Sequence, residues 1–439
     1  MTILDDRSLH DPAGTRAQVA TLFAPESVLA EIVRIESVLA GVQAGLGIIP
    51  NEAASAIQAG AAGWRPDPEA VMRHRAHVGH PMVAILDAFS EGIAPEGREW
   101  LHYGTTTADV FRTIGVVLLH RSVAVYDAAL GRIEARLASL AATHRATPMI
   151  GRTLGRHALP ITFGAKVATW LTECRRDRER LMAWAARFPS GVLSGAVGTH
   201  AAMGPLGIQV EQQVMAQLGL GAPEPVDTKG SNDLYADFGA AVAISARGCQ
   251  RIAQEIFLLQ GDDLREVSLS TATVGSSTMP HKSNPTLCLE VMSRAREVSA
   301  SLTVLLEWIV TIFERDSALH NGALAQMCID MAQVLSCTEG MLNQLHVHPD
   351  AMLTNIGRTR GAIYTESVTV QLAERLGRRS AHELMRDLVA RMQTTGEGLD
   401  EALATDPRCA GVTLPRPGDA IGVAPDLVDA CLTRLGFSD

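Results

Sequence analysis

Residues 274–285, VGSSTMPHKSNP, bring together side chains that could do chemistry in a chain otherwise rich in helical patterns. Ser276 could act as a base if it were activated. Lys282 and Asn284 stand two residues apart, so an extended backbone would point both towards one anion. The spacing GxxxxGK[ST] of a phosphate-binding P-loop is absent. Met279 and two prolines stiffen the segment, although a mobile linker would have a similar composition.

Two further segments carry more polar groups than helix packing requires. Residues 102–109, HYGTTTAD, contain threonines and an aspartate, which commonly cap helices. Residues 151–160, GRTLGRHALP, place Arg152, Arg156 and His157 before a long helical pattern, where a helix start and positive charge could attract an anion. A helix cap and a solvated loop would explain these two segments without any chemistry.

The segment GSSTMPHKSNP resembles the signature loop of the fumarase/aspartase superfamily, which reads roughly GSSxMPxKxNP. HYGTTTAD and GRTLGRHALPITFG are similar to the first and second conserved regions of that superfamily, in the same order. The resemblance extends over essentially the whole chain. SGAVGTHAAMG, RIAQEIFLLQGDDLREV and PGDAIGVAPDLVDACL look like the branch that holds 3-carboxy-cis,cis-muconate cycloisomerase and adenylosuccinate lyase, and the N-terminal helix looks closer to the cycloisomerase.

The resemblance implies an enzyme that breaks or forms a C–O or C–N bond beta to a carboxylate. It identifies Ser276 as the base that removes the proton alpha to the carboxylate, activated as an alkoxide by nearby cations and backbone donors. Lys282 and Asn284 match the residues that grip the substrate carboxylate, and Thr106 and Thr107 match a Thr-Ser pair that binds the same group. The doubly negative intermediate must then be stabilised electrostatically.

Further substrate contacts follow from the same resemblance, some of them loosely. His80 and His102 match active-site histidines of the family, and a cap or a core contact is the alternative for His102. Arg315 matches a family arginine, and Arg156 stands where acidic or amide residues are common. Met279 belongs to the signature segment itself. We therefore expect these residues at the substrate, which would be a small anionic polycarboxylate.

Two departures from the family pattern bear on the reaction. The histidine that acts as general acid in fumarase and adenylosuccinate lyase is replaced by Leu154, and the glutamate paired with it by Leu289. His157 is the nearest substitute acid, or else a residue that orients the loop at a helix start. A leaving group that departs as a stable anion needs less protonation, which favours a cycloisomerase-like reaction. A lyase acting on an N-substituted or nitro-substituted succinate, and a non-catalytic ligand-binding relative, are the alternatives.

Changes elsewhere alter the expected charge map of the site. Where the branch carries a Gln-Arg-Asp-Arg run, this chain has Asn232 and Leu234 at the arginine positions. Conversely, Arg112 appears where an acidic or amide residue is common. We therefore expect a polycarboxylate site whose arginines are rearranged, so the substrate can differ from that of the named relatives.

Composition excludes several other classes of function. The 439 residues carry a net charge of −10 without a basic cluster, so we expect no nucleic acid partner. The N-terminus lacks an apolar h-region and no run of about 18 apolar residues appears, so we expect a cytoplasmic protein without a membrane segment. We expect no metal, since His74, His77 and His80 lack carboxylate support, and no cofactor. Seven scattered cysteines predict buried, reduced thiols.

The segments that must position these residues read as helices. Apolar periodicity predicts a helical region over 25–62 and long helices over about 108–145, 161–187, 233–260, 285–310 and 319–345. We expect an all-α fold: an elongated five-helix bundle over 109–353, with its signature loop at about 268–285, between smaller helical domains over 1–108 and 354–439. The resemblance implies a homotetramer with a twenty-helix core, whose active sites are each shared between three chains.

Overall fold

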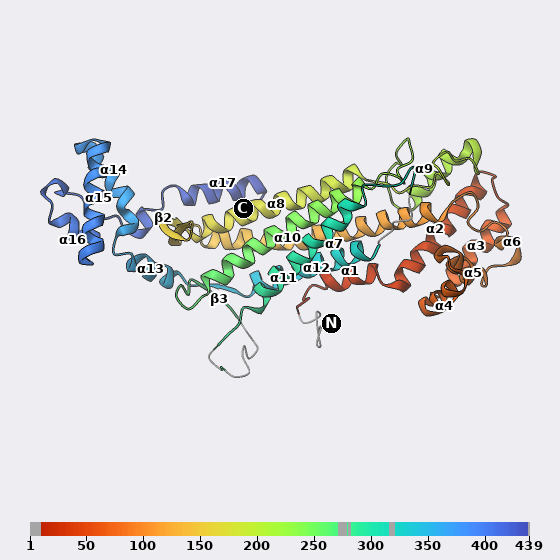
Figure 1. Ribbon diagram of the computed structural model, residues 1–439, viewed down its shortest axis with the longest axis horizontal. Coiled ribbons are helices and arrows are strands. Elements are labelled where there is room, and N and C mark those ends of the chain that lie inside the picture. Colours follow the sequence, from red (N-terminus) through yellow and green to blue (C-terminus); the bar gives the residue numbers. More distant parts are fainter. Residues whose placement is uncertain (1–9, 271–278, 280–281, 316–320, 438–439) are drawn as a thin grey trace. The chain divides into compact units, whose positions relative to one another are not determined.

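The computed structural model describes residues 10–270, 279, 282–315 and 321–437, and these are mostly helical (Figure 1). The helical segments predicted from periodicity are confirmed, most of their ends lying within about two residues of those expected. The long helices are α7 (Thr107–Thr143), α8 (Phe163–Arg187), α10 (Asp233–Leu259), α11 (Thr286–Glu307) and α12 (Asn321–Asn343).

Shorter helices precede and follow these. The N-terminal region contains α1 (Thr15–Leu22), α2 (Pro25–Gly45), α3 (Asn51–Gly63), α4 (Pro68–Val78), α5 (Pro81–Ser90) and α6 (Pro95–Arg98). Further along the chain lie α9 (Gly207–Gln217), α13 (Pro349–Arg358), α14 (Thr365–Leu376), α15 (Arg378–Thr395), α16 (Leu399–Ala404) and α17 (Ala424–Leu435).

Local sequence explains several of the helix ends. Asp67 caps α4 by accepting a hydrogen bond of 2.9 Å from the amide of Ala70, and proline occupies the first position of α4. Gly79 ends the same helix with φ of +76°, a conformation that glycine adopts without a steric cost. The region predicted as one helical stretch over 25–62 is interrupted between α2 and α3, where Pro50 precedes the first residue of α3.

A β-hairpin occupies residues for which the sequence indicated a loop or a helix start. β1 (Pro148–Thr153) pairs antiparallel with β2 (Arg156–Thr162). The two residues between the strands, Leu154 and Gly155, have φ of +52° and +75°. Positive φ at both positions is the requirement of a type I′ turn, whose twist matches that of the strands. A second short pair joins β3 (Val267–Leu269) to β4 (Leu345–Val347).

By residue contacts the chain forms two compact units. The first unit comprises residues 1–129, 177–247 and 293–336, and the second comprises residues 130–176, 248–292 and 337–439. Both units contain segments of the long helices α7, α8, α10, α11 and α12. The boundary between the units cuts these helices, so it does not test the division into regions over 1–108, 109–353 and 354–439, which stays a prediction.

Each unit has its own apolar core. In the first unit, α8 and α10 run side by side (Figure 1), and the indole nitrogen of Trp184 donates to the carbonyl of Leu234 over 2.8 Å. The core there is lined by aliphatic side chains from α2, α5, α7 and α9, among them Ile32, Ile35, Leu39, Ala84, Val110, Val210 and Val214. In the second unit, α14, α15 and α16 surround a core that includes Val368, Leu372, Ala381, Leu384, Leu399 and Ala402.

The cysteines were predicted to be buried thiols. Six of the seven cysteines are buried, as the scattered pattern predicted, whereas Cys431 is half-buried. Burial raises the pKa of Cys288 and of Cys328 to about 12.

Within the described residues, α7 alone has the length and hydropathy of a membrane span. Inside the protein, 56% of its most apolar window is buried, as expected of a core helix.

Candidate active site

The first candidate segment forms the cap of α7. The amide and the hydroxyl of Thr106 each donate to Oδ2 of Asp109 over 2.8 Å, and the hydroxyl of Thr105 donates to the same oxygen over 3.2 Å. This arrangement confirms the helix-cap interpretation of HYGTTTAD. Thr107 is the first residue of α7, so both predicted carboxylate-binding threonines lie at the N-terminus of a 37-residue helix. Backbone amides at such a terminus also favour an anion.

A buried ion cluster of Asp109, Lys229 and Asp227 contacts this cap. Oδ1 of Asp109, which is fully buried, accepts from Nζ of Lys229 over 2.9 Å and from the amide of Ser194 over 3.1 Å. The ammonium group also lies 2.7 Å from Oδ1 of Asp227, and only 2% of the Lys229 side chain is exposed. Because the two carboxylates share one buried cation, the cap and the loop at 227–229 are held together.

The candidate histidines of the first unit take structural positions. His102 has φ of +62°, and its Nδ1 lies 2.7 Å from a carboxylate oxygen of Glu36, of which 1% is exposed. This is the core contact that the sequence left open for His102. His80 is exposed and caps α5, its Nδ1 accepting from the amide of Val83 over 3.3 Å. His74 lies on α4, and its Nε2 is 2.7 Å from Oδ2 of Asp87, so the expectation that this histidine lacks a carboxylate partner is wrong.

The second candidate segment is the β1–β2 hairpin of the second unit. Arg156 and His157 are exposed on β2, where they lie opposite Thr153 and Arg152 of β1. Arg156 and His157 are therefore presented by a strand and not beside a helix start. Leu154 lies at the turn with its side chain fully exposed, at 101%. At the position where the family carries a general acid, the chain thus presents an apolar side chain that cannot transfer a proton.

The third candidate segment is described only in part, and Ser276 lies outside the described residues. Met279 and Lys282 are exposed, and the amide of Lys282 donates to the carbonyl of Met279 over 3.0 Å. Asn284 is half-buried, two residues before α11 begins. Leu289 lies in the first turn of α11 with 46% of its surface exposed.

The predicted site residues are divided between the two units. Thr106, Thr107, His80, His102 and Arg315 belong to the first unit, whereas Arg156, His157, Met279, Lys282 and Asn284 belong to the second. Arg315 is exposed at the end of a described range. The structure therefore gathers the candidate residues within each segment, and the three segments do not all belong to one compact unit.

The unexpected arginine at position 112 has a structural role. Its guanidinium donates to Oδ1 of Asn232, to the carbonyl of Ser231 and, over 3.0 Å, to the carbonyl of Thr228. The guanidinium also lies 4.8 Å from the centre of the Tyr235 ring, and 4% of Arg112 is exposed. The expectation that Arg112 contributes to a rearranged anion site is thus replaced by a buried contact with Asn232.

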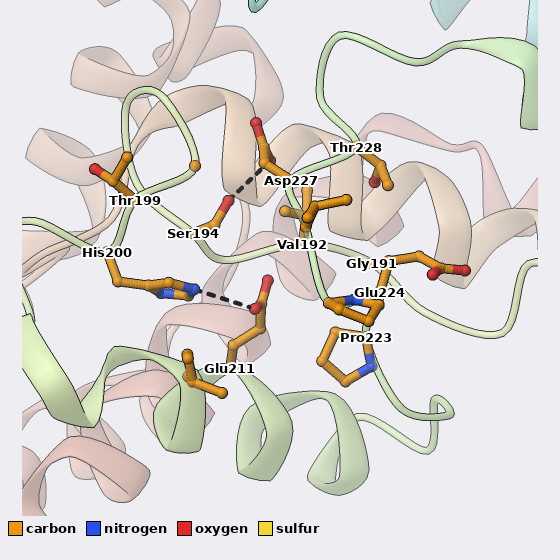
Figure 2. A pocket seen from close by; sticks show the side chains of 14 residues that line it. Gly191, Val192, Ser194, Thr199, His200, Glu211, Pro223, Glu224, Asp227 and Thr228 are labelled. Atoms are coloured by element: carbon orange, nitrogen blue, oxygen red, sulfur yellow. Dashed lines mark hydrogen bonds and ion pairs between the residues drawn. The ribbon is translucent and has the colours of Figure 1, made fainter.

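A cavity of about 240 Å³ in the first unit lies beside the ion cluster (Figure 2). Figure 2 shows Ser194 hydrogen-bonded to Asp227, and His200 directed towards Glu211, whose nearest oxygen lies 3.5 Å from Nε2. Burial lowers the pKa of His200 and raises the pKa of Glu211. Glu224 also lines this cavity, and so many carboxylates disfavour an anionic ligand there. The cavity is therefore a poor candidate for a polycarboxylate site.

Two buried ion pairs beside the candidate segments were not predicted from the sequence. Lys229 lies in a loop without a recognisable motif, and its partner Asp109 was interpreted only as a helix cap. Arg152 was interpreted as a source of positive charge, whereas it pairs with Glu266. The described residues contain no group of three metal-ligating side chains. No periodicity or spacing in the sequence could have found pairs so distant along the chain.

Comparisons with known proteins agree with the architecture and the motifs. A family model described as "Lyase" matches residues 25–299. Adenylosuccinate lyase of Methanocaldococcus jannaschii is 30% identical, with 93% of this chain and 92% of that protein covered. 3-Carboxy-cis,cis-muconate cycloisomerase of Pseudomonas aeruginosa is 28% identical, and the match covers 100% of this chain and 99% of that protein. Among solved structures, the chain resembles the crystal structure of a fumarate lyase from Mesorhizobium sp. BNC1 with a TM-score of 0.89. The two sequences are 31% identical, and the match covers 95% of this chain and 97% of that chain.

The family model covers more than half of the chain, and the relatives match along nearly its whole length. The resemblance first indicated by GSSTMPHKSNP is therefore confirmed. The chain belongs to the lyase family of the fumarase/aspartase superfamily, and it is a lyase or intramolecular lyase of that superfamily.

Proposed function

We propose that the protein catalyses beta-elimination, or its reverse, on a small polycarboxylate, and that the reaction is a lactonisation of the 3-carboxy-cis,cis-muconate cycloisomerase type. The observation that carries this proposal is the combination of an intact signature segment with leucine at both positions of the acid–base pair, Leu154 and Leu289. Leu154 is fully exposed at the hairpin turn, which fits a site that uses no acid at this position.

In the direction of elimination, the Ser276 alkoxide takes the proton alpha to a carboxylate and the leaving group departs from the beta carbon with its electron pair. In the direction of lactonisation, a carboxylate oxygen forms a bond to the beta carbon and the Ser276 hydroxyl returns a proton to the alpha carbon. A carboxylate is a stable anion and can leave without protonation. This chemistry therefore does not need the pair that Leu154 and Leu289 replace.

The remaining roles follow from charge and position. Thr106 and Thr107, with Lys282 and Asn284, hold the carboxylate next to the reacting carbon. Arg156, His80, Met279 and Arg315 complete the contacts with the substrate, and His102, whose Nδ1 contacts Glu36, does so through its other ring nitrogen. His157 is exposed, so it could supply a proton if the reaction needs one, or it could orient the neighbouring segment.

The proposed assembly is a homotetramer in which each active site takes its three segments from three chains. The first support is that the candidate residues are divided between two units. The second is that α10 and α11 expose large apolar side chains, which a partner subunit could cover. These side chains are Ile244, Val304 and Leu306 in the first unit and Phe257, Leu258 and Leu289 in the second. Light scattering should give four times the mass of one chain. An active monomer would contradict the assembly. We further propose that the protein is cytoplasmic and binds neither membrane nor nucleic acid.

The serine assignment is tested with two neighbouring variants. Ser276→Ala should abolish turnover of 3-carboxy-cis,cis-muconate, whereas Ser277→Ala, its matched control in the same segment, should retain turnover. Circular dichroism should show that both variants keep their helix content. Turnover by Ser276→Ala at the wild-type rate would refute the serine base.

A fumarate-releasing lyase is the second candidate function, since adenylosuccinate lyase and a fumarate lyase are among the relatives. The substrate would then be an N-substituted or nitro-substituted succinate. Fumarate absorbance with a panel of such succinates, and no lactone from the muconate, would favour this reaction. Binding of fumarate without turnover of either class would indicate a ligand-binding relative.

A further inference from the structure

A buried ion pair joins two elements of the second unit. The guanidinium of Arg152 contacts both carboxylate oxygens of Glu266, over 2.9 Å and 2.7 Å. Glu266 is fully buried, and 18% of the Arg152 side chain is exposed. Nδ2 of Asn355 donates to the same carboxylate over 2.9 Å. Every oxygen of this buried carboxylate thus has a donor, which is the condition under which such a charge is tolerated.

The two residues stand at informative places in the chain. Arg152 belongs to β1 and lies opposite His157 in the hairpin. Glu266 immediately precedes β3, the strand from which the chain continues into the signature segment. Asn355 lies on α13, which packs against β1 (Figure 1). The pair therefore ties the hairpin of the second candidate segment to the strand that precedes the third segment in the sequence.

We propose that Arg152 and Glu266 are positioning residues, which fix the hairpin against β3 so that Arg156 and His157 keep the geometry needed for turnover. This inference rests on the proposed function, because it assumes that the hairpin and the signature segment serve the reaction. Neither residue is assigned a contact with the substrate. Both act through the elements that they hold.

The chemistry of the pair suits positioning better than it suits stability. A buried ion pair adds little net stability over apolar side chains of similar size, because both charges lose their hydration. A bidentate guanidinium–carboxylate contact does fix distance and direction, since two parallel hydrogen bonds resist both sliding and rotation. Displacing a reacting group by about 1 Å can slow turnover by about a hundredfold.

A second pair in the same unit provides a matched control. Arg175 contacts both oxygens of Glu134 over 2.9 Å and 3.0 Å, and 1% of the Glu134 side chain is exposed. This pair joins α7 to α8 and involves none of the candidate segments. If buried pairs act only through stability, loss of either carboxylate charge should have the same consequences.

The test compares Glu266→Gln with Glu134→Gln in the full-length protein. Both variants should lower the melting temperature by similar amounts. Only Glu266→Gln should speed amide hydrogen exchange in residues 148–153 and 267–270, and it should lower kcat by about tenfold to a hundredfold while KM changes by less than about threefold. Glu134→Gln should keep kcat within about twofold of wild type. Arg152→Lys, which keeps the charge but not the bidentate contact, should give an intermediate kcat.

Two outcomes would overturn the proposal. One is an equal loss of kcat in Glu266→Gln and Glu134→Gln. The other is an unchanged rate of amide hydrogen exchange in residues 148–153 and 267–270 of Glu266→Gln. If Glu266→Gln does not fold, Arg152→Lys carries the same comparison. Failure of the proposed function gives a different result, because the wild-type protein would then form no lactone from 3-carboxy-cis,cis-muconate. The exchange measurement needs no substrate and would still report whether the pair holds the two elements together.

Discussion

Replacing Lys229 by methionine should destabilise the first unit strongly. Methionine has a similar length but no charge, so Asp109 and Asp227 would lose the cation that they share. Lys229 Nζ lies 2.9 Å and 2.7 Å from these two carboxylates, and Asp109 is fully buried. Breaking a buried pair by removing one partner costs about 3–5 kcal/mol, because the other charge stays buried without compensation.

The assay is thermal unfolding by calorimetry at a fixed protein concentration. In a unit of this size each kcal/mol shifts the melting temperature by about 2–4 °C, so Lys229→Met should lower it by roughly 6–20 °C. The control is Arg379→Met, which removes the ion pair with Glu383 on the surface of α15 and should cost less than about 0.5 kcal/mol.

A double variant separates the loss of charge balance from the loss of packing. Asp109→Asn combined with Lys229→Met removes one of the two uncompensated carboxylates, so it should recover about 1–3 kcal/mol relative to Lys229→Met alone. A melting temperature of Lys229→Met no lower than that of Arg379→Met would refute the reasoning. So would a double variant less stable than both of its parents.

Three further predictions concern single sites. Leu154→Asn should raise the melting temperature by about 1–4 °C, because asparagine tolerates φ of +52° at a type I′ turn. An unchanged melting temperature would contradict this and would mean that the leucine side chain is covered in the native assembly. Thiol titration at about pH 8 should find Cys431 reacting first, since burial raises the pKa of Cys328 to about 12, and a fast phase that survives Cys431→Ser would contradict this. Burial lowers the pKa of His200, so the unfolded chain binds a proton that the folded chain does not, and the free energy of unfolding should fall as pH drops below about 6.5. His200→Asn should lessen this fall. Equal slopes of unfolding free energy against pH in the variant and the wild type would exclude the effect.

The long helices could be predicted because their signal is local. Apolar residues recurring every three to four positions place one face of a helix in the core, and each of α7, α8, α10, α11 and α12 carries such a pattern. The hairpin was missed because its turn is not the Asn-Gly or Asp-Gly that marks a type I′ turn. Leu154 takes φ of +52° instead, which its sequence neighbourhood does not indicate.

The candidate site was predictable where the chemistry lies within one short segment. The cap formed by Thr106 and Asp109 joins residues three positions apart, and its residue types indicate it directly. The buried pairs were not predictable, because Asp109 and Lys229 are 120 residues apart and Arg152 and Glu266 are 114 apart. Only the folded chain decides which of many carboxylates meets which cation.

The two buried clusters share one design, which bears on how this chain could bind a polycarboxylate. In each, a fully buried carboxylate, Asp109 or Glu266, lies beneath a candidate segment and takes up a cation of its own chain. A negative charge left uncompensated there would repel an anionic substrate. Glu266 is neutralised by Arg152, whereas Asp109 shares the single charge of Lys229 with Asp227, so exposed cations of the second unit such as Arg156 and Lys282 are not required to balance Glu266. The proposed substrate would therefore meet a local surplus of positive charge in a chain whose net charge is −10.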